Sequence, residues 1–336
     1  MTQVGKWTLL EIVGQGAAAT VWRATDFERT VTVKVADAAD AKARQSLAHE
    51  GRILRQLEHP TLPRLIEIVE TPPALVFESP PAQTYSELLS KGTLWTLPLS
   101  QRLETLSVIA AALDWLHDQN IIHRDVKPAH LTVTDPPLLF DFGIAQMIAD
   151  TSPPDPDAGT AAYMPPPGEP VSIVRDAYAF AVTTYELLLG AHPLLVAADR
   201  DIAPGVLRQR AASKVLKDSW RKPSTVPHWE LPPDLRSARL DRLDELFTEA
   251  LGAPEKRPKR LAPWMNYVRA CIPPGEDNLT VAPKVLPAAF EPAHTAHEVA
   301  SSLRTDGTSR GRRWRAIVVA LAFLAIVVLV VILLRR

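Results

Sequence analysis

The apolar and polar positions divide the chain into a part that favours strands and a part that favours helices. Near the N-terminus, short runs rich in β-branched residues alternate with turns and predict five strands: WTLLEIVG, ATVWRAT, TVTVKVA, LPRLIEIVE and PALVFES. Between the third and fourth of these strands, residues 41–59 carry apolar side chains at helical spacing. Pro60 ends this predicted helix.

Helical patterns dominate from Tyr85 onward. The segments SELLSKG and LSQRLETLSVIAAALDWLHDQN, together with residues 176–190 and 240–252, have the apolar spacing of helices. Beyond about Cys271 this spacing fades into Pro, Ala, Ser and Thr, so a flexible linker is predicted over 271–315. A small β-rich lobe followed by a larger helical lobe is therefore the expected architecture.

Residues 316–334 form a long apolar run, AIVVALAFLAIVVLVVILL. A helix here would span roughly 28 Å, close to the hydrocarbon thickness of a bilayer. Arginines flank it, more of them on the N-terminal side, and Trp314 lies where an interfacial aromatic residue is expected. Because no secretory signal precedes the domain, the sequence predicts a single-pass protein of the inner or plasma membrane with its domain in the cytoplasm. A buried core helix is the alternative, and no external domain is expected after Arg336.

The composition narrows the class of protein. A formal net charge of -1, with 46% hydrophobic and 22% charged residues, is typical of a globular protein and argues against a nucleic-acid partner. Cys271 is the single cysteine, so the sequence has neither a disulfide framework nor a cysteine metal cluster.

A glycine-containing turn and two charged residues suggest a phosphate site. Gly14 and Gly16, followed by Val21, lie between the first two predicted strands, where glycine lets backbone amides approach phosphate oxygens. An ordinary hairpin would explain the same turn. Lys34 would point inward from the third strand and, if buried, would need a partner, for which Glu50 is the candidate. Taken separately, each of these two residues also fits a solvated surface charge.

Two further stretches of sequence favour a phosphate site over an ordinary hairpin with surface charges. Residues 121–131 read IIHRDVKPAHL and residues 139–143 read LFDFG. In this order, after a glycine turn and a strand lysine, they resemble the HRD and DFG motifs of protein kinases. The resemblance covers residues 7–270, with GTAAYM, DAYAFAVTTYELLLG and EKRP, and is to the eukaryotic-type (Hanks-type) bacterial serine/threonine kinases.

The resemblance implies a fold and a domain division. The fold class would be α+β, the two-lobed protein kinase-like fold, with an N-lobe over about 7–80 and a C-lobe over about 84–270. One transmembrane helix over 316–334 would follow the linker.

The resemblance also assigns roles to the charged residues. Asp125 would accept or orient the proton of the attacking hydroxyl, and Lys127 would stabilise charge on the transferred phosphoryl group. Asp141 would hold Mg²⁺, or Mn²⁺, on the phosphates of ATP. Lys34, paired with Glu50, would bind the α- and β-phosphates.

Other residues complete the expected nucleotide site and its support. Glu78 joins Gly14, Gly16 and Val21 among the residues expected to bind the nucleotide. Asp176 would brace the catalytic loop by accepting backbone amides.

The segment after Asp141 carries the features of the serine/threonine branch. Thr160 with Lys127 resembles that branch, and Thr160 is expected to contact the catalytic loop. Arg124 resembles the arginine of kinases switched by loop phosphorylation, for which Thr151 and Ser152 are the candidate sites.

Three departures concern the nucleotide and its metal. His130 stands where the family has a metal-binding asparagine, and since Mg²⁺ prefers oxygen, metal binding should depend mainly on Asp141. Pro80, three residues after Phe77 at the gatekeeper position, has no N–H for adenine, which removes a hydrogen bond of about 0.5–1.5 kcal/mol. The adenine slot gains polarity because two threonines replace its usual Ala and Leu, namely Thr32 and Thr132.

A fourth departure concerns the substrate platform. In YMPPPGEP, Pro167 takes the place of the family's APE glutamate, so Arg257 lacks its usual partner. Glu169 is the candidate substitute.

Three functions remain open on this sequence. The first is an active serine/threonine kinase with protein substrates and a transient homodimer for autophosphorylation in trans. The second is a membrane-anchored pseudokinase that binds nucleotide or acts as a scaffold, as His130 and the altered APE segment would allow. The third, a small-molecule kinase, is disfavoured by GTAAYM, which resembles a protein-substrate loop.

Overall fold

The computed structural model describes residues 2–16, 19–148, 150, 155, 158–195, 206 and 220–273, all within the unit that extends from Met1 to Ala293. The predicted membrane helix at 316–334 and nearly all of the predicted linker lie outside these residues. Within the described part of the chain, no helix is both long enough and apolar enough for a membrane crossing.

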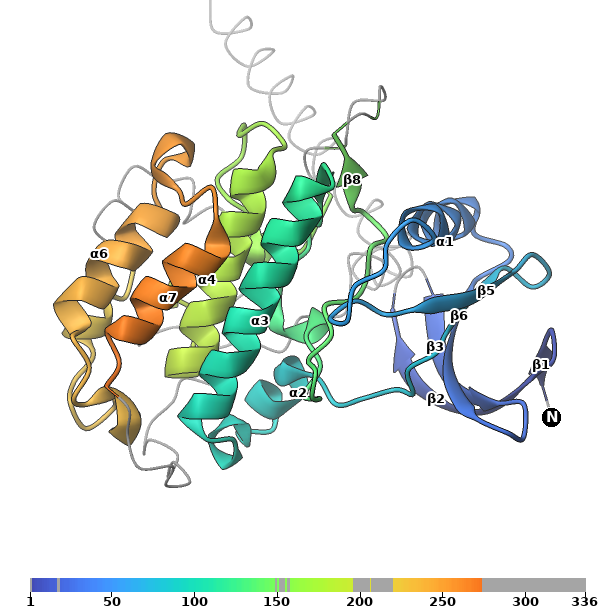
Figure 1. The fold of residues 1–336 in the computed structure, drawn as a ribbon, viewed down its shortest axis with the longest axis horizontal. Helices are drawn as coiled ribbons and strands as arrows, with labels where there is room; N and C mark the ends of the chain where they lie inside the picture. The colour runs from blue at the N-terminus through green and yellow to red at the C-terminus, as the bar shows by residue number, and fades with distance from the viewer. Residues whose placement is uncertain are drawn as a thin grey trace, which may run out of the picture. The chain divides into compact units, whose positions relative to one another are not determined.

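An antiparallel sheet forms the N-terminal lobe (Figure 1), and its strands lie in the order β1-β2-β3-β4-β6-β5. All five predicted strands are present in it. The strand β1 was not predicted because two residues carry no readable alternation. The bounds are β1 Gln3–Val4, β2 Trp7–Gln15, β3 Ala19–Thr25, β4 Thr30–Ala36, β5 Leu65–Val69 and β6 Ala74–Phe77.

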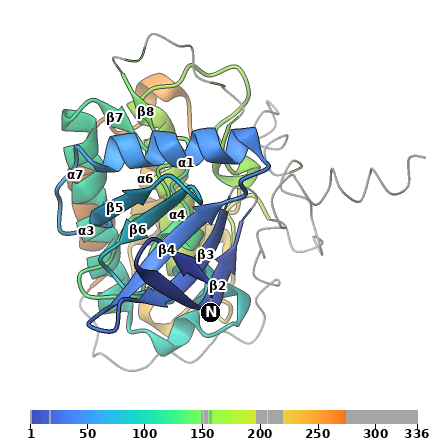
Figure 2. The ribbon, with the colours of Figure 1, turned by 90° about the vertical axis from the view of Figure 1, so that its right-hand side faces the viewer.

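The two faces of this sheet have different roles. Val31 and Val33 of β4 are buried in a small cluster on one face. Because side chains alternate along a strand, Lys34 and Ala36 point to the other face. The helix α1 (Ala41–Leu54) lies across that face, as Figure 2 shows.

The helix α1 begins at a side-chain cap and packs closely on the sheet. Asp40 accepts hydrogen bonds from the amides of Lys42 and Ala43, at 2.8 and 3.1 Å. A Cβ at Gly51 would lie 2.9 Å from Cδ2 of Leu75, so glycine permits this close approach to β6.

Helices make up the C-terminal lobe, which confirms the predicted α+β division into two lobes (Figure 1). The longer helices are α2 Tyr85–Ser90, α3 Leu99–Asp118, α4 Ile173–Leu189, α6 Leu240–Ala250 and α7 Leu261–Ala270. A two-stranded ribbon pairs β7 Ile121–Ile122 with β8 Gln146–Met147. Short 3₁₀ turns are η1 Leu94–Thr96, η2 Pro128–His130, η3 Ala161–Tyr163, η5 Pro223–Thr225, η6 Pro233–Leu235 and η7 Pro254–Lys256.

The helix α4 is the centre of this lobe, since nearly all of its residues are buried, and α3 and α7 pack with it in one core. The sequence prediction missed α7. Its buried residues nevertheless recur at helical spacing, namely Leu261, Trp264, Met265 and Val268. Its first amides are bonded by Asp114 of α3, which accepts from Leu261 and Ala262 at 2.7 and 3.0 Å.

Candidate active site

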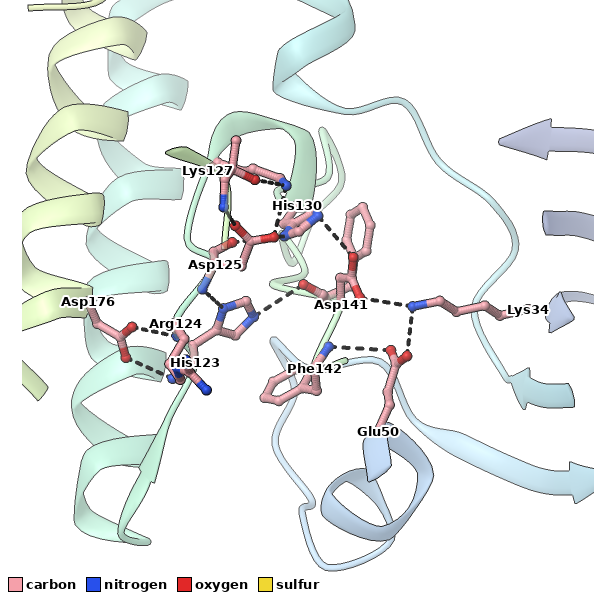
Figure 3. Close-up of polar contacts among 12 residues, drawn as sticks. Lys34, Glu50, His123, Arg124, Asp125, Lys127, His130, Asp141, Phe142 and Asp176 are labelled. Carbon is pink, nitrogen blue, oxygen red and sulfur yellow. Dashed lines mark hydrogen bonds and ion pairs between the residues drawn. The ribbon is translucent and has the colours of Figure 1, made fainter. Parts of the chain in front are cut away.

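A half-buried lysine links the sheet, α1 and the segment after β7. Nζ of Lys34 lies 2.7 Å from Oε2 of Glu50 and 2.9 Å from Oδ1 of Asp141 (Figure 3). Burial alone would lower the pKa of Lys34, but the carboxylates of Asp141 and Glu50 outweigh it and raise that pKa. The expected Lys34–Glu50 ion pair is therefore present, and the lysine is charged at neutral pH.

One face of α1 holds the residues that follow Asp141. Ser46 donates to the carbonyl of Gly143 at 3.0 Å, and Nε2 of His49 donates to the carbonyl of Ala145 at 2.6 Å. The amide of Phe142 donates to Oε1 of Glu50 at 3.3 Å. The sequence prediction missed the first two contacts. Their one signal in the sequence was that His49 and Glu50 follow Ser46 by three and four residues, which places all three on one face of α1.

A buried carboxylate supports the turn that carries Asp125. Arg124 has a φ of +72°, a left-handed conformation that costs a non-glycine residue about 1–2 kcal/mol. Asp176 accepts hydrogen bonds from the amides of Arg124 and His123 at 2.8 and 2.9 Å, as predicted (Figure 3). His117, which sequence reasoning did not identify, contacts the same carboxylate at 2.9 Å. These bonds hold the turn in its strained conformation.

Three residues surround the carboxylate of Asp125. Lys127 donates to its Oδ2 at 2.9 Å, and the amide of Thr160 donates to its Oδ1 at 3.0 Å. Lys127 also donates to the hydroxyl of Thr160, so the expected contact of Thr160 with this loop is present. Burial would raise the pKa of Asp125, but Lys127 and His130 lower it below its usual value. Asp125 is therefore an ionised hydrogen-bond acceptor at neutral pH.

His130 lies between the two aspartates. Its Nδ1 is 2.8 Å from the carbonyl oxygen of Asp125, and its Nε2 is 3.1 Å from Oδ2 of Asp141 (Figure 3). Burial would raise the pKa of Asp141, but Lys34 and His130 hold it well below its usual range. One ligand atom each from Asp125, His130 and Asp141 lies within 4.8 Å of the others. Two carboxylates and an imidazole at this separation fit a divalent cation.

The described part of the glycine turn lies next to Lys34. Val21 is the register partner of both Gly14 and Lys34, and the amide of Gly16 donates to the carbonyl of Ala19 at 2.9 Å. Residues 17 and 18 at the tip lie outside the described residues. Of the three predicted hairpin positions, Val21 therefore lies directly beside the lysine, and Gly14 lies one strand further away.

Glu78 is not brought into this cluster through its side chain. In the described structure its carboxylate contacts NH1 of Arg64 at 3.1 Å, on the surface. Its amide donates to the carbonyl of Arg64 at 2.9 Å. Any contact of Glu78 with a nucleotide would therefore use its backbone carbonyl.

The threonines expected to make the adenine slot polar have partners within the chain. Thr32 donates to the carbonyl of Ser79 at 2.8 Å, in the segment that carries Pro80. The hydroxyl of Thr132 accepts from the amide of Leu138 at 2.8 Å. Because both hydroxyls are already bonded, they add less polarity to the slot than the sequence alone suggests.

The altered platform segment has a substitute ion pair. Arg257 donates to both carboxylate oxygens of Glu169, at 2.6 and 2.7 Å, so the predicted substitution is confirmed. The side chain of Arg257 is 0% exposed and also lies over the ring of Tyr178. The candidate phosphosites Thr151 and Ser152 lie outside the described residues.

The expected roles of Lys34, Asp125 and Asp141 require these three side chains to lie around one nucleotide. Lys34, Asp125 and Asp141 come from segments far apart in the chain, yet they lie in one network joined through His130. Comparison with known families finds the protein kinase domain over residues 7–260. The chain belongs to the protein kinase family. The resemblance to the eukaryotic-type bacterial serine/threonine kinases is thereby confirmed.

Individual relatives support this membership. The serine/threonine-protein kinase PkaA of Streptomyces coelicolor is 32% identical over 260 residues, which is 68% of this chain and 45% of that kinase. The kinase PknB of Mycolicibacterium smegmatis is 30% identical over 365 aligned positions, 97% of this chain and 54% of the relative. Calcium/calmodulin-dependent protein kinase type 1 of Macrobrachium nipponense is 28% identical over 218 residues, 60% and 62% of the two chains. The kinase chain thus spans less than two thirds of each of these relatives.

Proposed function

We propose that the protein is an ATP-dependent serine/threonine protein kinase that transfers the γ-phosphoryl group to hydroxyls of protein substrates. The observation that carries this proposal is the convergence of Lys34, Asp125 and Asp141, with the Lys34–Glu50 ion pair formed. Phosphoryl transfer depends on positioning and charge neutralisation, which such a network supplies. The relatives whose names state serine/threonine kinase activity support the same function.

Asp125 and Lys127 have the geometry for the acceptor side of the reaction. The ionised carboxylate of Asp125 accepts a hydrogen bond from the substrate hydroxyl, orients it and takes up its proton as the new bond forms. The ammonium group of Lys127, 2.9 Å from that carboxylate, neutralises charge on the transferred group. Thr160 keeps Lys127 in place by accepting its second hydrogen bond.

The nucleotide side uses the residues around Lys34. Lys34 binds the α- and β-phosphates, while backbone amides near Gly14 and Gly16 approach them from the hairpin. Asp141 and His130 would hold Mg²⁺ or Mn²⁺, which supplies positive charge to the phosphate oxygens when it is bound.

The proposal is tested by following radiolabel from ATP onto the full-length protein in detergent, with Mg²⁺ or Mn²⁺. Label on the wild type and none on Asp125→Asn would support transfer by this site. The control Asp241→Asn removes an exposed carboxylate of α6 and should label like the wild type. Labelled protein with Asp125→Asn unchanged would contradict the assignment.

A pseudokinase is the second candidate, and His130 in place of the usual asparagine favours it. Nucleotide would then raise the melting temperature of the wild type, while neither metal would support label transfer. A lower melting shift in Lys34→Met would show that the binding uses the same site.

The proposal includes a membrane location. Residues 316–334 have the length and apolar character of a single membrane-spanning helix, and the preceding arginines favour a cytoplasmic kinase domain. A lipid bilayer and, transiently, a second copy of the chain are the proposed partners besides protein substrates.

A further inference from the structure

The residue that departs most from the family's metal chemistry is His130, and its surroundings suit a nitrogen ligand. We infer that the site formed by Asp125, His130 and Asp141 binds Mn²⁺ in preference to Mg²⁺, with Nε2 of His130 as a direct ligand. This inference rests on the proposed function only in that a cation is taken to bind beside the nucleotide.

The hydrogen bond of Nδ1 determines which imidazole nitrogen faces the site. A carbonyl oxygen only accepts, so Nδ1 carries a hydrogen and donates it to the carbonyl of Asp125 at 2.8 Å. Nε2 is therefore the atom that offers a lone pair. Nε2 lies 3.1 Å from Oδ2 of Asp141, so a cation held by that carboxylate would be within reach of this lone pair. Metal-binding histidines commonly have this arrangement, in which a backbone carbonyl fixes the far nitrogen.

Packing keeps the ring in this orientation. The side chain of His130 is 7% exposed, and its ring centroid lies 5.5 Å from that of Phe140. The backbone of His130 is fixed on both sides, since its amide donates to Lys127 and its carbonyl accepts from Phe140. A ring held in this way loses little entropy when it binds a cation, so the site is pre-organised.

The donor set then determines the choice of cation. Mg²⁺ prefers an all-oxygen octahedron and keeps several waters, so replacing an amide oxygen by an imidazole weakens its binding. Mn²⁺ accepts imidazole together with carboxylates and lies above Mg²⁺ in affinity for nitrogen ligands. One donor atom from each of Asp125, His130 and Asp141 lies within 4.8 Å of the other two, so the three side chains are gathered around one point that a cation could occupy.

Pulsed electron paramagnetic resonance of Mn²⁺ tests the ligand directly. Full-length protein in detergent is loaded with Mn²⁺ and the methylene analogue of ATP, which is not hydrolysed. The wild type should show nuclear modulation from a coordinated nitrogen. That signal should change to the ¹⁵N pattern when histidine alone is ¹⁵N-labelled, a result that needs no variant.

Two variants assign the signal among the nine histidines of the chain. His130→Asn should abolish the histidine modulation and lower the Mg²⁺ concentration that displaces half of the Mn²⁺ by about tenfold. His228→Asn, which changes an exposed histidine away from the site, should leave both measurements unchanged. His130→Gln gives a second test should the asparagine variant fold poorly.

The outcomes separate this inference from the proposed function. Wild-type Mn²⁺ without histidine modulation, or modulation that persists in His130→Asn, would overturn the inference even where radiolabel transfer succeeds. Histidine modulation that depends on His130, found without any transfer, would uphold the metal assignment and contradict the kinase proposal.

Discussion

At the scale of single residues, the active site and the platform segment depend on charges that are paired within the fold. Lys34 has Glu50 and Asp141, Asp125 has Lys127, and Arg257 has Glu169. Leaving a buried charge without its partner costs free energy of folding. Removing one member of a pair therefore measures how much the fold depends on that pair.

The Arg257–Glu169 pair gives the clearest test of this point. Glu169→Ala leaves a guanidinium that is 0% exposed without its carboxylate, and should lower the free energy of unfolding by about 3–5 kcal/mol. Urea denaturation measures the change. The control Glu245→Ala breaks an exposed pair with Arg242, each 61% exposed, and should cost less than about 1 kcal/mol. Equal costs for the two variants would show that the buried pair has no special role.

A buried acid on α4 predicts a pH dependence of stability. Glu186 accepts a hydrogen bond from Tyr163 at 2.7 Å, and burial raises its pKa from 4.5 to about 8. Between pH 4.5 and about 8, Glu186 therefore keeps its proton in the folded protein but has released it in the unfolded chain. This stabilisation is complete below pH 4.5 and is lost as the pH rises towards 8, by up to about 1.4 kcal/mol per pH unit.

The variant Glu186→Gln isolates this effect, because the amide has nearly the same shape and does not titrate. Urea denaturation between pH 5.5 and 8.5 should show the wild type losing stability relative to the variant as the pH increases. Parallel curves for the two proteins would contradict the raised pKa.

At the scale of elements, the sequence predicted most of the secondary structure because each element has a clear period. The five strands and the helices α1 to α4 and α6 follow from alternation or helical spacing. The helix α7 has the same spacing in Leu261, Trp264, Met265 and Val268, so its omission was an error of interpretation.

Contacts between elements were harder to predict from the sequence than the elements themselves. The bonds of Ser46 and His49 to the segment after Asp141, and that of His117 to Asp176, join residues 59 or more positions apart. A one-dimensional pattern predicts which face of a helix is buried, but not which backbone carbonyl meets it. The motif residues were found because their spacing along the chain is itself the signal.

The start of α7 gives a prediction at this scale. Asp114 accepts from the amides of Leu261 and Ala262, which the residue before the helix leaves without a side-chain cap. Asp114→Ala should therefore lower the free energy of unfolding by about 1–2 kcal/mol and speed hydrogen exchange at the first turn of α7. Glu249→Ala, which removes an exposed carboxylate of α6, should change neither measurement appreciably. Unchanged exchange in Asp114→Ala would rule out this capping role.

At the scale of the whole molecule, the described lobes contain the complete network of Lys34, Asp125 and Asp141, all within residues 7–260 of the family match. The proposed membrane helix over 316–334 contains no charged residue. Its expected effect is therefore on how often two kinase domains meet and not on the chemical step.

Confinement to a membrane should raise the rate of phosphorylation between copies of this kinase. Two chains in one bilayer meet at a higher effective concentration than two chains in bulk solution. Autophosphorylation of the full-length protein in liposomes should therefore be faster than that of a variant lacking 316–336 at equal bulk concentration, and should slow as added lipid dilutes the protein on the surface. A catalytically inactive Asp125→Asn copy, mixed with active protein of distinguishable mass, reports transfer between chains directly. Equal rates for the two proteins, or label confined to the active copy, would show that the anchor does not act by bringing chains together.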